Sequence, residues 1–95
     1  MQLQDLHDKS KGVSALSLFT SLENTVISIQ LHQKEELKEH ITKIPALLLC
    51  VLGSVRYIDE NAETTHLLPG QYVEIPALLK HRLEALEDSQ LILVK

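Results

Sequence analysis

The sequence is poor in aromatic residues, with two tyrosines, one phenylalanine and no tryptophan among 95 residues. Proteins that bind single-stranded nucleic acids stack bases on aromatic side chains, so this class of partner is disfavoured. Positive charge is also scarce, because nine Lys and Arg stand against 13 Asp and Glu, for a formal net charge of -4. Contacts with a phosphate backbone depend on clustered basic residues. We therefore expect no nucleic-acid partner.

A single cysteine excludes an internal disulfide. Cys50 lies in the apolar run 47–52, where a small buried hydrophobic residue is expected and a reactive thiol is not. No apolar run approaches the length of a membrane span. The N-terminus lacks the charged start and apolar stretch of a signal peptide. These absences predict a cytoplasmic protein without a membrane partner.

What the chain does contain is a rhythm of short apolar segments. Turn residues separate these segments roughly every ten positions, a spacing typical of a β-sandwich or β-barrel. In the segment 25–31, Ile27, Ile29 and Leu31 fall on one face at period two. No helix is required anywhere, and the length suits one domain. The sequence therefore predicts an all-β, single-domain protein.

The stretch from Gly70 to His81 resembles the second sequence motif of the cupin superfamily. That motif runs as Gly, five residues, Pro, one residue, Gly, two residues, His, three residues and Asn. Gly70, Pro76 and His81 fall on matching positions. Leu78 replaces the second Gly, and Ala85 replaces the Asn. The segment 68–71 also suits a type II turn, with Pro and then Gly at its centre.

The first cupin motif is matched in spacing but less in chemistry. It runs as Gly, five residues, His, one residue, His, three or four residues, Glu, six residues and Gly. His40 matches the first His, and Gly53 matches the closing Gly. Lys34 stands at the opening Gly, Thr42 at the second His and Ala46 at the Glu.

The resemblance covers about residues 25–95 and implies a cupin-like double-stranded β-helix, a jelly-roll barrel with a pocket inside. Residues 1–24 are then an N-terminal arm and edge strand. In the family, two His, one Glu and a third His hold a divalent metal, and here only His40 and His81 remain. Because a catalytic metal normally has three protein ligands, we expect at most a weakly bound metal at these two residues.

Two functions stay open. The first is a binding module, such as a sensor, that holds a small polar or anionic molecule in a pocket lined by His40, Thr42 and His81. The alternative is a minimal metal-dependent enzyme of the isomerase or dioxygenase type that uses His40 and His81. Fold analogy is a weak guide to reaction class, so no catalytic residue is assigned and the choice between enzyme and binding protein is left open. His7 is expected to be solvated, and His32 and His66 to be surface or strand-end residues.

The segments 46–52 and 91–94 are apolar on both faces, which predicts strands buried on two sides. A single barrel gives each strand only one inner face, so outward residues, for which Leu48 and Ile92 are candidates, need another cover. Because uncovered apolar patches usually mark interfaces, we expect a homodimer that pairs through them. The competing hypothesis is that residues 1–20 fold back over the patch and keep the protein monomeric.

Overall fold

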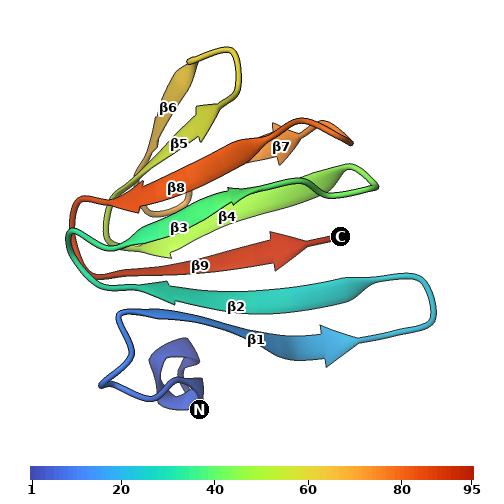
Figure 1. The fold of residues 1–95 in the computed structure, drawn as a ribbon. Helices are drawn as coiled ribbons and strands as arrows, with labels where there is room; N and C mark the ends of the chain where they lie inside the picture. Colours follow the sequence, from blue (N-terminus) through green and yellow to red (C-terminus); the bar gives the residue numbers. More distant parts are fainter.

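The computed structural model describes the backbone of residues 1–95 and every side chain except those of Glu39 and His40. Two antiparallel sheets form the described chain, with strand orders β1-β2-β9-β4-β7 and β3-β8-β5-β6 (Figure 1). The elements are η1, a 3-10 helix (Leu3–Leu6), and the strands β1 (Val13–Thr20), β2 (Thr25–Leu31), β3 (Glu36–His40), β4 (Ala46–Leu52), β5 (Val55–Asp59), β6 (Thr64–Leu67), β7 (Tyr72–Ile75), β8 (His81–Ala85) and β9 (Ser89–Val94). No α-helix occurs in this described backbone, which confirms the all-β prediction.

Apolar side chains from both inner faces fill the space between the sheets. On β2 the inner face carries Ile27, Ile29 and Leu31, as the period-two pattern predicts. Leu91 of β9 lies directly opposite Ile29. Full burial of one such aliphatic side chain contributes roughly 1.5–3 kcal/mol. Cys50 is completely buried in the same core, as predicted, and burial raises the pKa of its thiol.

Strand β4 is not buried on both faces within one chain, so that prediction is wrong. Leu48 is 1% exposed and lies on the inner face, opposite Leu93. Its neighbours Leu47 and Leu49 lie on the outer face and are only half-buried. Leu48 is therefore not an outward residue. Ile92 is outward as predicted, because it lies opposite Leu49.

The backbone adopts a positive φ at all four glycine positions of the two motifs. The angle is 89° at Gly53 and 87° at Gly70. It is 73° at Lys34 and 66° at Leu78, where this sequence has lost the glycine. A left-handed conformation costs a residue with a Cβ roughly 1–2 kcal/mol. The retained conformation supports the motif alignment at positions where the residue type does not match.

The two motif glycines that this sequence has, Gly53 and Gly70, meet different requirements. A Cβ at Gly53 would collide with Ser89, so this turn needs glycine for space as well as for its φ. Gly70 has open space around it and needs only its φ. It is the third residue of a turn in which the Gln71 N–H donates to the Leu68 carbonyl at 2.9 Å. This geometry confirms the type II turn.

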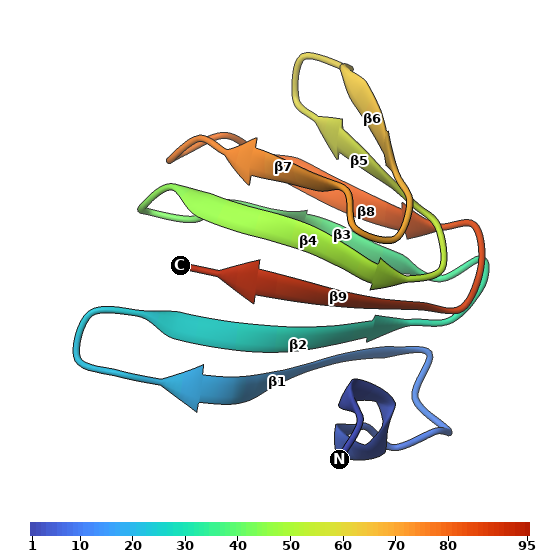
Figure 2. The ribbon, with the colours of Figure 1, turned by 180° about the vertical axis from the view of Figure 1, so that it is seen from behind.

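The N-terminal segment packs on the outer face of the larger sheet, beside β1 (Figure 2). His7 is 5% exposed, so the prediction that it is solvated is wrong. Its ring nitrogens hydrogen-bond to Ser14 Oγ of β1 at 2.8 Å and to Ser28 Oγ of β2 at 2.9 Å. Two serines at outward positions of neighbouring strands thus satisfy both ring nitrogens. Burial lowers the pKa of His7.

Gln30 fastens the same segment to the sheet. Its amide donates to the carbonyls of Asp8 and Lys11, both at 3.3 Å. Its side-chain oxygen accepts a hydrogen bond from the Gln90 amide of β9 at 2.9 Å. The segment therefore covers the polar end of this face. It leaves Phe19, further along β1, 62% exposed, so the N-terminal segment does not cover the whole outer face.

Replacing Leu78 by Gly should stabilise the fold. The change relieves a positive φ and loses little burial, because Leu78 is 67% exposed. We expect a gain of roughly 0.5–1 kcal/mol in the free energy of unfolding, after the greater freedom of glycine in the unfolded chain is subtracted. Urea unfolding of the variant and of Ala77→Gly measures it. The control lacks a positive φ and should lose stability, and equal losses in both variants would contradict the strain at Leu78.

Acidification should destabilise the protein through His7. The folded-state pKa of His7 is lowered, so its contribution is fully present above the unfolded pKa of about 6.5. It is lost as the pH falls through 6.5 towards the folded-state pKa. Urea unfolding at about pH 8 and about pH 5.5 should show a larger loss for the wild type than for His7→Gln. An equal loss in both proteins would mean that His7 contributes nothing to the pH dependence.

Candidate functional site

His81 lies on the inner face of β8, where it alternates with Leu83 and Ala85. It is 2% exposed. Its Nδ1 lies 3.0 Å from the carbonyl oxygen of Leu79. A carbonyl oxygen can only accept, so Nδ1 carries the proton and donates. In the neutral ring, Nε2 is then the nitrogen with the lone pair, as in histidines that bind metals or accept protons.

Tyr57 of β5 lies beside this imidazole on the inner face. The two ring centroids are 5.7 Å apart, with the ring planes tilted by 31°. The Tyr57 hydroxyl is buried and has no hydrogen-bond partner among the described residues. Burial, and then the nearby Asp59 carboxylate, raise the pKa of Tyr57, so the phenol stays protonated. It presents an unused donor inside the barrel.

Thr42 is a further buried polar residue, in the loop after β3, and it lines a hollow beside the connection of β1 and β2. It is 6% exposed, and its Oγ1 also lacks a hydrogen-bond partner in the described part of the chain. Its carbonyl accepts the Leu78 N–H at 2.8 Å, which ties the loop after β3 to the loop before β8. The sequence predicted Thr42 and His81 as pocket residues. It did not predict Tyr57, although Val55 and Tyr57 alternate on β5 in the pattern of an inward strand face.

The backbone of His40 pairs with that of His81 in the β3–β8 ladder. The ladder is irregular between Leu37 and His40. The side chain of His40 lies outside the described residues, so its predicted role as a pocket residue and metal ligand stays a prediction. The fold brings the backbones of the two motif histidines together.

The described side chains do not fit the metal site of the family. No group of three His, Cys, Asp or Glu side chains in the described part of the chain could hold a metal ion. The position of the family's Glu is occupied by Ala46, a buried methyl group that cannot coordinate. Thr42 offers a hydroxyl in place of an imidazole. Of the four motif ligands, the described residues retain only the His81 ring.

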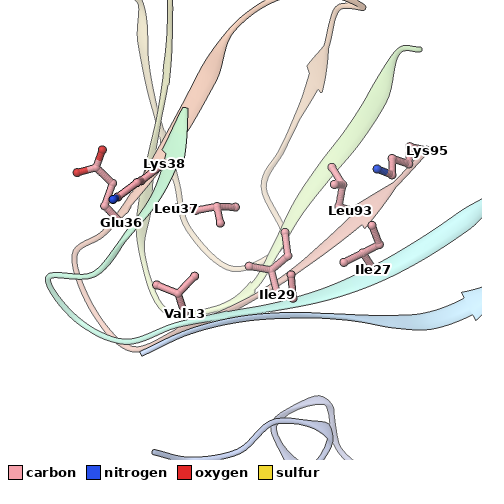
Figure 3. A pocket seen from close by; sticks show the side chains of 9 residues that line it. Val13, Ile27, Ile29, Glu36, Leu37, Lys38, Leu93 and Lys95 are labelled. Atoms are coloured by element: carbon pink, nitrogen blue, oxygen red, sulfur yellow. The ribbon is translucent and has the colours of Figure 1, made fainter. Parts of the chain in front are cut away.

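A separate cavity of about 540 Å³ opens between the sheets, on the side where β1 and β2 face β3 (Figure 3). Its volume lies in the range of roughly 300–1,000 Å³ common for ligand pockets. Six apolar residues line it: Val13, Ala15, Ile27, Ile29, Leu37 and Leu93. Glu36 and Lys38 lie at one rim and Lys95 at the opposite side. His81 and Thr42 do not line this cavity.

The two remaining histidines are placed as predicted. His66 is exposed on β6 and its Nε2 hydrogen-bonds with Ser54 Oγ. His32 follows directly after β2 and is half-buried. Neither belongs to the interior group around His81. Among the described residues, no helix has the length and apolar character needed to cross a membrane.

No protein-family model and no curated protein matches the sequence. Solved structures match the fold well. A cupin superfamily protein from Desulfitobacterium hafniense superposes with a TM-score of 0.86 at 14% identity, over 98% of this chain and 84% of that one. A conserved protein with a double-stranded β-helix domain from Klebsiella pneumoniae gives a TM-score of 0.86 at 14% identity, over 99% and 85%. An RmlC-like cupin from Methanocaldococcus jannaschii gives 0.79 at 16% identity, over 94% and 84%.

Three observations agree on the architecture. The two facing sheets give the topology, the positive φ values fall on the motif glycine positions, and the superpositions extend over nearly the whole chain. Identities of 14–16% speak for the fold and not for an activity. The chain therefore has the double-stranded β-helix fold of the cupins, in a small single-domain form.

Proposed function

We propose that the barrel binds a small polar or anionic molecule at the interior group formed by His81, Tyr57 and Thr42. The observation that carries the proposal is that two buried hydroxyls, Tyr57 Oη and Thr42 Oγ1, have no hydrogen-bond partner among the described residues. An unsatisfied buried polar group costs about 1–3 kcal/mol. Such groups usually meet a water, an ion or a ligand. A ligand that accepts hydrogen bonds from both hydroxyls would remove this cost.

The chemistry of the group favours binding over turnover. The protonated Tyr57 phenol donates, and the Thr42 hydroxyl can donate or accept, so a carbonyl or carboxylate oxygen suits both. The carboxylate that raises the pKa of Tyr57, that of Asp59, accepts hydrogen bonds from the N–H groups of Asn61 and Glu63 at 2.8 and 3.2 Å. It is engaged in the β5–β6 turn, which does not suit a general base. A sensor or carrier role is consistent with these donors.

The proposal predicts opposite effects of Tyr57→Phe on the free and the ligand-bound protein. Without ligand, the variant should equal or exceed the wild type in stability, because it removes an unsatisfied buried hydroxyl. A thermal-shift screen of small carboxylates, sugars and amino acids should find compounds that raise the melting temperature of the wild type. The rise should be lost in Tyr57→Phe and in the near-isosteric Thr42→Val. Tyr72→Phe, at a tyrosine that is 62% exposed, should respond like the wild type.

Two outcomes would contradict this function. If Tyr57→Phe destabilises the free protein by several kcal/mol, the hydroxyl has a structural partner and is not reserved for a ligand. If no compound class raises the melting temperature but divalent metals do, the metal-dependent enzyme replaces the binding module. The placement of the Nδ1–H of His81 against a carbonyl oxygen favours this second candidate. The loss of the Glu and of the second His weighs against it.

We also propose that the protein forms a homodimer through the outer face of the larger sheet. Two adjacent rows of that face are largely apolar, and each crosses all five strands of the sheet. One row consists of Phe19, Val26, Val94, Leu47 and Glu74, and the other of Leu16, Ser28, Ile92, Leu49 and Tyr72. Glu74 is the only charged member. A face of this kind suits a second copy of itself, because the same patch serves both partners.

Substitutions at Ile92 and Leu48, the two candidate outward residues of the sequence analysis, should distinguish an interface position from a core position. Light scattering of the wild type should give about twice 10.7 kDa. Ile92→Glu, on the outer face, should give a folded protein of half that mass. Leu48→Glu should unfold the chain instead, because Leu48 is 1% exposed on the inner face.

Ile58→Glu provides the matched control, since Ile58 is a half-buried residue on the outer face of the other sheet. It should leave the mass at the dimer value. A wild-type mass near 10.7 kDa would refute the pairing, and a dimer that survives Ile92→Glu would place the interface elsewhere.

A further inference from the structure

One residue of the cavity between the sheets, Lys95, is a charged side chain at the end of an otherwise apolar inner row. Along β9, Leu91 and Leu93 point inward at period two. Lys95 continues that period, and its backbone pairs with Thr25 through hydrogen bonds of 2.7 and 3.0 Å. A half-buried lysine thus occupies an inward register position at the end of an apolar row. Figure 3 shows its amine turned from the strand towards the cavity.

The Lys95 ammonium has no ion-pair partner among the described residues. The acidic residue on the other rim, Glu36, lies 3.4 Å from Arg82 on its own sheet. Glu23, which lines two neighbouring hollows together with Lys95, makes no ion pair with it either. A cation on an apolar inner face is stabilised when an anion meets it. The cavity therefore combines an apolar body with an ammonium group at Lys95 that makes no ion pair with a described side chain.

We propose that this cavity binds an amphipathic monocarboxylate, with its apolar part between β2 and β3 and its carboxylate at Lys95 Nζ. The apolar lining, which includes Ile29, Leu37 and Leu93, excludes a sugar or another highly polar molecule, because few polar atoms are there to replace its hydration. The ammonium groups of Lys95 and Lys38, which both line the cavity, disfavour a cationic head group. The site is distinct from the hydroxyl group at Tyr57 and Thr42, neither of which lines the cavity.

Isothermal titration with three ten-carbon probes tests the assignment. Decanoate, decanol and decyltrimethylammonium share the apolar body and differ in the head group, and all are used below the concentration at which they form micelles. Decanoate should bind about tenfold more tightly than decanol, the increment of one charge-assisted hydrogen bond. The cationic probe should bind more weakly than decanol.

Two variants assign the head group and the body separately. In Lys95→Met, decanoate should bind as weakly as decanol, while the affinity for decanol stays unchanged. Lys9→Met, at an exposed lysine of the N-terminal segment, should keep the tenfold preference. Ala15→Phe places a ring into the cavity from an exposed position on β1 and should abolish binding of both compounds.

The proposal is overturned if the wild type binds neither decanoate nor decanol, or binds both equally. It is also overturned if Lys95→Met keeps the preference for decanoate, or if Ala15→Phe binds decanoate as the wild type does. Tyr57→Phe should bind decanoate unchanged. A loss of binding in that variant would place the carboxylate at the interior hydroxyls and not at Lys95.

Discussion

The barrel depends on reversing the chain between two facing sheets with the backbone at positive φ. Lys34 lies between β2 and β3, Gly53 between β4 and β5, Gly70 between β6 and β7, and Leu78 between β7 and β8. Each of these connections passes from one sheet to the other. At these four crossings the backbone takes a conformation that only glycine adopts without strain. The described residues of the other two crossings, from β3 to β4 and from β8 to β9, have no positive φ. The core then stabilises the strained conformation at Lys34 and Leu78, because inward strands can meet only if these turns form.

This constraint explains how much of the fold was predictable. Glycine, proline and period-two alternation are local signals, and they predicted the strands and the type II turn. The barrel was implied by the resemblance to the cupin motifs. The faces of β4 were not predictable, because a strand that is apolar at every position has no alternation to orient it. Burial of His7 was equally inaccessible, since its partner Ser28 lies 21 positions away and only the sheet brings them together. The motif alignment predicted Thr42 and His81 as pocket residues, and both are buried, but only the structure shows Tyr57 beside His81.

The interior shows what replaces a metal centre when its ligands are lost. With a methyl group at Ala46 and a hydroxyl at Thr42, these two motif positions supply no charge to offset a cation. Neutral hydrogen-bonding groups are left instead, and the Tyr57 phenol, held protonated by burial, is the strongest donor among them. The side cavity, by contrast, is lined by the side chain of Lys95. One barrel thus offers two environments of different chemistry, a polar interior group and an apolar cavity with a cationic end.

The outer face of the larger sheet also has two parts, a polar part that the N-terminal segment covers and an apolar part that it leaves uncovered. This arrangement limits where a partner can bind. Ser28 and Ile92 lie directly opposite one another, yet Ser28 is completely buried by the segment that carries His7, whereas Ile92 is only half-buried. A second copy that extended over Ser28 would have to displace this segment. That displacement would break the hydrogen bonds of His7 and Gln30, and each buried polar group left unsatisfied costs about 1–3 kcal/mol. The proposed interface is therefore confined to the parts of the two rows that the N-terminal segment leaves uncovered, and Ser28, buried beneath His7, marks its boundary.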